Sequence, residues 1–227
     1  MNWIAQFFTS SLGKKVIMSL TGLFLCLFLV VHLIGNLQLL KNDGGESFNT
    51  YTYFMTHNPL IVIISYTLYT FILIHTVQGL LLYFQNKAAR KNTYDRKSGS
   101  SSTFESRNMA LLGSLIFIFL GVHMGDFWWK MKTGVLEKTA YEGYGEIVNL
   151  YTRVDAAYKE WWIVLFYVLS MIILAYHLKH GFQSAFQSLG INHSKYTPII
   201  KFIGIVFSVL IPLGFAIIPI GRFFFFK

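Results

Sequence analysis

The sequence predicts an all-α integral membrane protein, a bundle of five transmembrane helices. Its composition is the first indication: 54% of the 227 residues are hydrophobic and 13% are charged, against roughly 25% charged residues in soluble domains. The second indication is a series of apolar stretches, each long enough to cross ~30 Å of hydrocarbon at about 1.5 Å per helical residue. The third is that the charged residues gather between these stretches. Helices are expected because a backbone in lipid must satisfy its own hydrogen bonds.

We interpret residues 1–227 as a single transmembrane domain. The spans are predicted at about 16–40, 59–84, 109–129, 161–189 and 198–220. Residues 1–15 form a short amphipathic entry, residues 41–58 a polar loop, and residues 130–160 a longer connection with room for a short surface helix. The single cysteine, Cys26, lies inside a span, so the sequence contains neither a disulfide framework nor a cysteine metal cluster.

The distribution of charge among the connections predicts the orientation. The basic residues on the N-terminal side of the bundle are Lys14, Lys15, Lys87, Arg90, Lys91, Arg96, Lys97, Arg107, Lys195 and Lys201. Against them stand Asp95 and Glu105, so the positive-inside rule places the N-terminus in the cytoplasm. The same rule explains the net charge of +9 better than nucleic-acid binding does, because the basic residues lie between apolar spans. We therefore expect a lipid bilayer, and no nucleic acid, around this chain.

Four histidines lie inside four different spans: His32, His75, His123 and His177. A histidine in hydrocarbon is costly unless its ring nitrogens have partners. The first and third spans run away from the N-terminal side, and His32 and His123 both lie ~10 Å below the far boundary. The second and fourth spans run back, and His75 and His177 both lie ~15 Å above the N-terminal boundary. The four histidines thus fall into two pairs at two depths.

Two levels with two imidazoles each are typical of two haem irons stacked across a membrane, each held between two histidines. Two other interpretations stay open, namely histidines hydrogen-bonded within the bundle and histidines on a proton path. A zinc site fits less well, because its ligands would converge on one tetrahedral point. His180 follows His177 by about one helical turn on the same face, so spacing alone leaves either as the fourth ligand.

Several short motifs carry a resemblance to a known family. They are SLTG at 19–22, VHLIGN at 31–36, IHTVQG at 74–79, VHMGDFW at 122–128 and YHLKHGF at 176–182. Together with the five-span layout they resemble the dihaem cytochrome b membrane-anchor subunit of succinate:quinone oxidoreductases, the succinate dehydrogenase and fumarate reductase complexes with a single large anchor. The resemblance covers nearly the whole chain.

The resemblance implies two haem b groups in the bacterial cytoplasmic membrane. His32 and His123 would be the axial ligands of the haem iron farther from the cytoplasm, and His75 and His177 those of the nearer one. It selects His177 over His180 as the fourth ligand. Ser19 would lie near a haem propionate. The glutamate that some fumarate reductases of this type carry two residues before the last ligand is Ala175 here, which puts that proton route in doubt.

The resemblance also implies partners and a reaction. A flavoprotein subunit would carry the dicarboxylate chemistry, as part of respiratory complex II and the tricarboxylic acid cycle. An iron–sulfur subunit would pass electrons through the two haems to a membrane quinone, menaquinone or another. We expect no catalytic residue in this chain, because no nucleophile, acid–base pair or phosphate loop stands out.

A quinone near the farther haem needs a proton-exchanging group on that side of the membrane, and Glu46 and His57 are the candidates in the sequence. Two alternative functions remain: a dihaem anchor of another respiratory oxidoreductase, and a haem-free transporter that couples to protons through its histidines.

Overall fold

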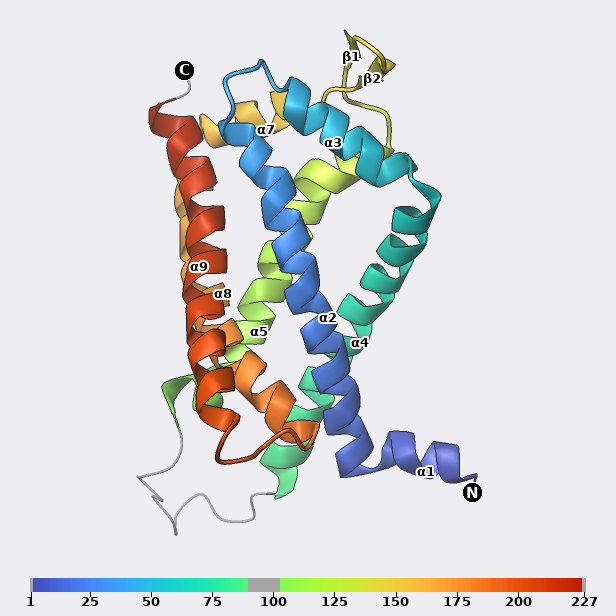
Figure 1. Cartoon of the computed structure of the whole chain (residues 1–227), viewed down its shortest axis with the longest axis vertical. Helices are drawn as coiled ribbons and strands as arrows, with labels where there is room; N and C mark the ends of the chain where they lie inside the picture. Colours follow the sequence, from blue (N-terminus) through green and yellow to red (C-terminus); the bar gives the residue numbers. More distant parts are fainter. Residues whose placement is uncertain (1, 90–102, 226–227) are drawn as a thin grey trace.

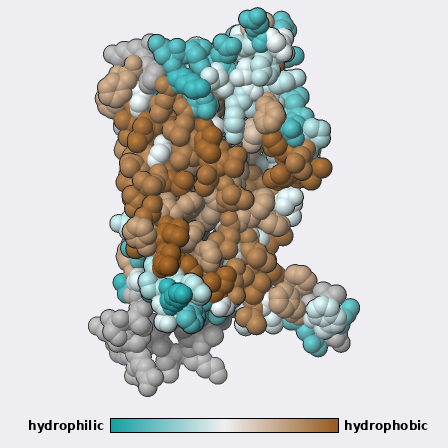
Figure 2. Space-filling model, in the orientation of Figure 1, coloured by the Kyte–Doolittle hydropathy of each residue, from teal (hydrophilic) through white to brown (hydrophobic). Residues whose placement is uncertain are grey.

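The structure, a computed structural model, describes residues 2–89 and 103–225 and confirms an all-α architecture with one small hairpin. In these ranges five helices are long and apolar enough to cross a membrane, as expected of a multi-pass membrane protein. They are α2 (Ser11–Leu37), α4 (Pro59–Ala89), α5 (Phe104–His123), α8 (Trp161–Ser188) and α9 (Thr197–Phe224). Figure 2 shows a broad hydrophobic band across the middle of the face in view, with hydrophilic residues toward both ends.

Four of these helices, α2, α4, α5 and α8, form a ring of neighbours (Figure 1). α2 packs against α4 and α8, and α5 packs against the same two helices. It follows that α2 faces α5 across the ring, and that α4 faces α8. α9 lies outside the ring against α8 and α2. The two facing pairs of helices are those that carry the paired histidines.

The two ends of the bundle differ in structure (Figure 1). The N-terminal end carries α1 (Trp3–Thr9), whose following residue Ser10 caps α2 by accepting a hydrogen bond from the Gly13 amide at 2.9 Å. The opposite end, here called the far end, carries α3 (Glu46–His57), the hairpin β1 (Lys138–Tyr141) and β2 (Gly145–Val148), α7 (Leu150–Tyr158) and the C-terminus. The basic residues Arg90, Lys91, Arg96 and Lys97, which contribute to the predicted orientation, lie outside the described residues.

The connection after α2 is more ordered than the predicted polar loop. A short 3₁₀ turn, η1 (Gln38–Leu40), ends the first span, and α3 then occupies most of residues 41–58. Gly44 and Gly45 take positive φ angles of 62° and 89° to turn the chain. The two carboxylate oxygens of Asp43 accept hydrogen bonds from the amides of Gly45 at 3.0 Å and Ser47 at 3.1 Å, which starts the helix. Burial raises the pKa of Asp43, but hydrogen bonds from the side chain of Ser47 and from the amides of Ser47 and Gly45 outweigh it, and the pKa lies below its usual value.

The third span ends in a π-helix. η2 (Met124–Trp129) follows directly after His123, the last residue of α5, and α6 (Lys130–Lys132) completes the span. π-helical turns are rare and occur often at functional sites. Here the turn carries Asp126, which pairs with Lys130 of α6 and with Arg153 of α7, so the third span is linked to α7 directly after His123.

A buried asparagine holds the far-end connections together. Asn49 of α3 is 1% exposed. Its amide nitrogen donates to the Tyr141 hydroxyl at 2.8 Å and to Asn149 Oδ1 at 2.9 Å, and its Oδ1 accepts from the Tyr151 amide at 3.0 Å. Since every one of these bonds joins α3 to the 138–151 region, Asn49 fixes the first far-end connection to the second.

An ion pair ties α7 to the last span. Asp155 of α7 bonds to the buried guanidinium of Arg222 in α9 and, at 2.8 Å, to Lys159. Burial raises the pKa of Asp155, but the hydrogen bonds from Lys159 and Arg222 outweigh it, and the pKa lies below its usual value. Burial, together with the nearby charge of Asp126, also raises the pKa of the Tyr158 hydroxyl, which stays protonated.

Candidate functional site

The four span histidines meet as two pairs across the helix ring. His32 of α2 and His123 of α5 have ring centres 5.7 Å apart, with planes at 89°. His75 of α4 and His177 of α8 have ring centres 6.4 Å apart, with planes at 65°. The first pair lies toward the far end and the second nearer the N-terminal end, in the combination that the depths in the sequence predict.

Both separations fit two imidazoles that bind one metal ion from opposite sides. A metal–imidazole bond of about 2 Å on each side, added to the distance from each nitrogen to its ring centre, places the centres roughly 6 Å apart. In the described ranges no three His, Cys, Asp or Glu side chains are grouped to hold a metal ion. Two imidazoles therefore suit a metal whose remaining ligands come from a flat macrocycle, which is how haem iron is held.

A hydrogen bond fixes the tautomer of His75. Thr21 of α2 is 3% exposed, and its hydroxyl donates to the backbone oxygen of Ile17 at 2.8 Å. Because a hydroxyl has one hydrogen, its contact of 3.1 Å with His75 Nδ1 is made with the ring nitrogen as donor. This leaves a lone pair on Nε2, the nitrogen then available to a metal.

His123 has a corresponding partner. The hydroxyl of Tyr167, a residue of α8 that is 6% exposed, lies 3.3 Å from His123 Nδ1. Each histidine pair thus has one ring held through Nδ1 by a buried hydroxyl from a neighbouring helix. The partner rings differ: Asn36 Nδ2 is 3.4 Å from both ring nitrogens of His32, a long contact, and His177 Nδ1 is buried without a hydrogen-bond partner among the described residues.

A repeated pattern that the sequence analysis missed surrounds these rings. Met18, Gly22 and His32 of α2 recur with the same spacing as Met109, Gly113 and His123 of α5. A Cβ atom at Gly22 would lie 3.1 Å from the His75 ring, and one at Gly113 would lie 3.6 Å from the His177 ring. These glycines admit the imidazoles of the neighbouring helices α4 and α8, and the identical spacing in two spans was the signal that would have found them.

The glycines that follow His75 and His177 by one turn have matching contacts. A Cβ atom at Gly79 would lie 3.1 Å from the Met18 side chain, and one at Gly181 would lie 3.6 Å from Met109. At the α2–α4 contact, the methionine of α2 lies against the glycine of α4, and the glycine of α2 lies against the histidine of α4. The α5–α8 contact has the same arrangement. The two halves of the ring repeat one packing arrangement.

The structure separates His177 from His180. The ring of His177 is the one that faces His75, whereas His180 is half-buried one turn farther along α8. Ser19 is buried in the N-terminal half of α2 and donates to the backbone oxygen of Lys15 at 2.9 Å.

Glu46 and His57 lie apart from each other. They are the first and last residues of α3, and both are exposed. A helix of 12 residues places its ends roughly 16 Å apart. The His57 ring stacks on Tyr53, with centres 4.0 Å apart, and its Nδ1 contacts the backbone oxygen of the same residue at 2.9 Å. α3 therefore does not bring the two predicted quinone residues into one site.

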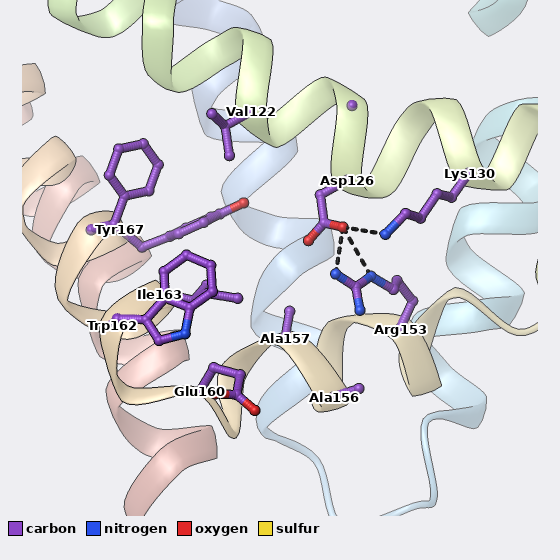
Figure 3. Close-up of a pocket in the computed structure, with 12 residues that line it drawn as sticks. Val122, Asp126, Lys130, Arg153, Ala156, Ala157, Glu160, Trp162, Ile163 and Tyr167 are labelled. Carbon is purple, nitrogen blue, oxygen red and sulfur yellow. Dashed lines mark hydrogen bonds and ion pairs between the residues drawn. The ribbon is translucent and has the colours of Figure 1, made fainter.

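A cavity of about 660 Å³ lies beside the far-end pair, between the end of the third span, α7 and the start of α8 (Figure 3). Its charged lining residues are Asp126, Lys130, Arg153 and Glu160, two acidic and two basic. Lys130 Nζ lies 2.6 Å from Asp126 Oδ1 and Arg153 Nε 3.0 Å from the same oxygen. Tyr167, the partner of His123, lines the same cavity.

Comparisons of this chain with protein-family models, with curated proteins and with solved structures each found no match.

Proposed function

We propose that this chain is a dihaem cytochrome b that anchors a succinate:quinone oxidoreductase in a bacterial cytoplasmic membrane, with its N-terminus in the cytoplasm. The observation that carries the proposal is the pair of facing imidazoles repeated at two depths, with ring centres 5.7 Å and 6.4 Å apart. The family resemblance of the histidine motifs supports the succinate:quinone assignment.

In this proposal the chain holds and orients cofactors and carries out no dicarboxylate chemistry. His75 and His177 hold the nearer haem b, and His32 and His123 hold the farther one. Haem supplies a one-electron couple at its iron when it is bound. Thr21 and Tyr167 contact Nδ1 of His75 and His123, which leaves Nε2 as the nitrogen that would bind the iron. The apolar helices exclude water from both sites.

The proposed partners are those that the family resemblance implies. An iron–sulfur subunit, itself bound to a flavoprotein subunit, docks at the N-terminal end of the bundle, close to the His75 pair. A membrane quinone, menaquinone or another, takes up the electrons at the other end. Two haems in series shorten each electron-transfer step between these partners.

Single histidine variants test the ligand assignment. His32→Ala, His75→Ala, His123→Ala and His177→Ala are each expected to lower the haem b content of the purified complex or to change the spectrum of one haem. His180→Ala and His57→Ala serve as matched controls, since each removes a histidine that belongs to neither facing pair. Both controls are expected to retain two haems. A full complement of haem in all four ligand variants would contradict the proposal and favour a haem-free transporter.

A further inference from the structure

We propose that the far-end cavity binds a zwitterionic phospholipid whose head group carries a primary ammonium, as that of phosphatidylethanolamine does. The cavity lies between the end of the third span, α7 and the start of α8. The inference goes beyond the proposed function and does not depend on haem, because it rests on the membrane depth, the charges and the walls of the cavity.

The cavity lies at the level of the lipid head groups. The third span ends at Lys132 and the fourth begins at Trp161, and the residues that line the cavity come from these two span ends and from α7 between them. Trp162 lines the cavity and is exposed, and tryptophan is enriched at the boundary between a membrane and water. A ligand in the cavity therefore has its polar part among the head groups and its apolar part along the spans.

The charges of the cavity form two centres of opposite sign. Asp126 pairs with Lys130 at 2.6 Å and with the guanidinium of Arg153, so this group of one anion and two cations has one net positive charge. Glu160 supplies a negative charge, and Figure 3 shows it apart from the other three side chains, at the start of α8. The four charges cancel in total, but a ligand meets a positive side and a negative side. A phosphate joined to an ammonium is the complement of this pattern.

The positive side offers hydrogen-bond donors to a phosphate. A guanidinium carries five N–H groups and a lysine ammonium carries three. Asp126 accepts from two nitrogens of Arg153 and from Lys130, which leaves further N–H groups on both cations. The side chains of Arg153 and Lys130 are 26% and 38% exposed, so a ligand in the cavity can reach them. Phosphate oxygens accept strong charge-assisted bonds from such donors.

The negative side suits a primary ammonium. Glu160 is exposed where it lines the cavity, so its carboxylate can accept a bond from a bound head group. The ammonium of phosphatidylethanolamine has three N–H groups to donate. The head group of phosphatidylglycerol has a phosphate but no positive charge, and it would leave Glu160 beside an anion. The cavity should therefore prefer phosphatidylethanolamine.

The remaining walls suit the glycerol and the first part of the acyl chains. They include Val122, Ile163 and Phe166. The cavity volume of about 660 Å³ lies within the range of roughly 300–1,000 Å³ that small-molecule sites occupy. Val122 and Trp162 are 49% and 56% exposed on the surface of apolar spans, so acyl chains leave the cavity directly into the bilayer.

The experiment uses the full chain, purified in detergent with the subunits that accompany it and washed to remove loosely held lipid. Native mass spectrometry counts the phospholipids bound per chain while dioleoylphosphatidylethanolamine or dioleoylphosphatidylglycerol is added. We expect one site per chain to fill first. Its Kd for phosphatidylethanolamine should be roughly two- to fivefold lower than its Kd for phosphatidylglycerol, the range that one exposed ion pair gives.

Two matched pairs of variants assign this lipid to the cavity. Glu160→Gln should abolish the preference between the two lipids, whereas Glu142→Gln, which removes an exposed carboxylate in the turn of the hairpin, should keep it. A Cβ atom at Gly121 or Gly125 would meet nothing within 4 Å, and of the two only Gly125 lines the cavity. Gly125→Leu should therefore weaken lipid binding by about tenfold or more, and Gly121→Leu should leave it unchanged.

Three results would overturn the inference. Phosphatidylglycerol that binds as tightly as phosphatidylethanolamine would contradict the part assigned to Glu160. Equal lipid binding in Gly125→Leu and Gly121→Leu would place the lipid elsewhere on the bundle. Displacement of the lipid by inorganic phosphate alone would show a phosphate site to which the acyl chains and the ammonium contribute nothing.

Discussion

Removing the two buried hydroxyl groups that contact histidine rings should shift the two haem potentials separately. Thr21 lies 3.1 Å from His75 Nδ1 and Tyr167 lies 3.3 Å from His123 Nδ1. A hydrogen bond accepted from the Nδ1 hydrogen makes the imidazole more electron-rich and stabilises the ferric state of bound iron. Thr21→Val should therefore raise the midpoint potential of the haem held by the His75 pair, and Tyr167→Phe that of the other haem.

The size of the shift follows from the strength of one hydrogen bond. A single bond contributes about 0.5–1.5 kcal/mol, which sets the upper limit on how far its loss can separate the two oxidation states. For a one-electron couple, where a tenfold change in the equilibrium corresponds to about 59 mV, this limits the rise to roughly 20–65 mV. The shorter contact of Thr21 predicts the larger of the two shifts.

A potentiometric titration followed by visible and electron paramagnetic resonance spectra measures both haems in one sample. Tyr158→Phe is the control for Tyr167→Phe: its ring centre is 5.4 Å from that of Tyr167, in the same aromatic cluster, and its hydroxyl is not the partner of His123. The reasoning fails if Thr21→Val and Tyr167→Phe move the same haem, if either lowers a potential, or if Tyr158→Phe produces the same shift.

Two further predictions concern the far end. Asp155→Asn removes the carboxylate next to the Arg222 guanidinium, which is 5% exposed, and should lower the free energy of unfolding by up to about 4 kcal/mol. Removal of the Lys159 side chain, which is 61% exposed, should lower it by less than about 1 kcal/mol. Thermal unfolding in detergent compares the two variants. The pKa of Asp155 is lower in the folded state than its unfolded value of about 3.9. The stabilisation that Asp155 contributes is therefore present above a pH of about 3.9 and is lost as the pH falls through the lower folded pKa. In that acid range the wild type should lose more stability than Asp155→Asn. Asn49→Ala leaves the Tyr151 amide and Asn149 Oδ1 without this buried partner and should lower the free energy of unfolding by about 1–3 kcal/mol. Asn58→Ala, at the start of α4, should lower it by about 1 kcal/mol or less. Equal losses of stability in the two variants would contradict the central role of Asn49.

The helices of the membrane region and the pairing of the histidines were accessible from the sequence. Long apolar stretches dictate helices in lipid, and a helix rises by a fixed amount per residue, so the depth of His32 or His177 follows from its distance to a span end. Facing helices then bring side chains of equal depth together. This is why the combinations His32 with His123 and His75 with His177 emerge from counting alone.

The far end was less accessible because tertiary contacts determine it. α3 is rich in threonine and aromatic residues, which have modest helix propensity, and it depends on Asp43 at its start and on Asn49 at its buried side. The hairpin and the cavity depend on the bonds of Asn149 to Asn49 and of Arg153 to Asp126, which join residues far apart in the chain. The Thr21 and Tyr167 contacts arise between helices, and no periodicity within one span indicates them.

The central claim is that two histidine pairs hold two haem b groups. A reduced-minus-oxidised visible spectrum of the purified complex, with haem quantified per copy of this chain, tests it most directly. We predict two b-type haems per chain, both reduced when succinate is added. A complex without haem would contradict the claim, and two haems that succinate leaves oxidised would retain the ligands but assign the anchor to a different oxidoreductase.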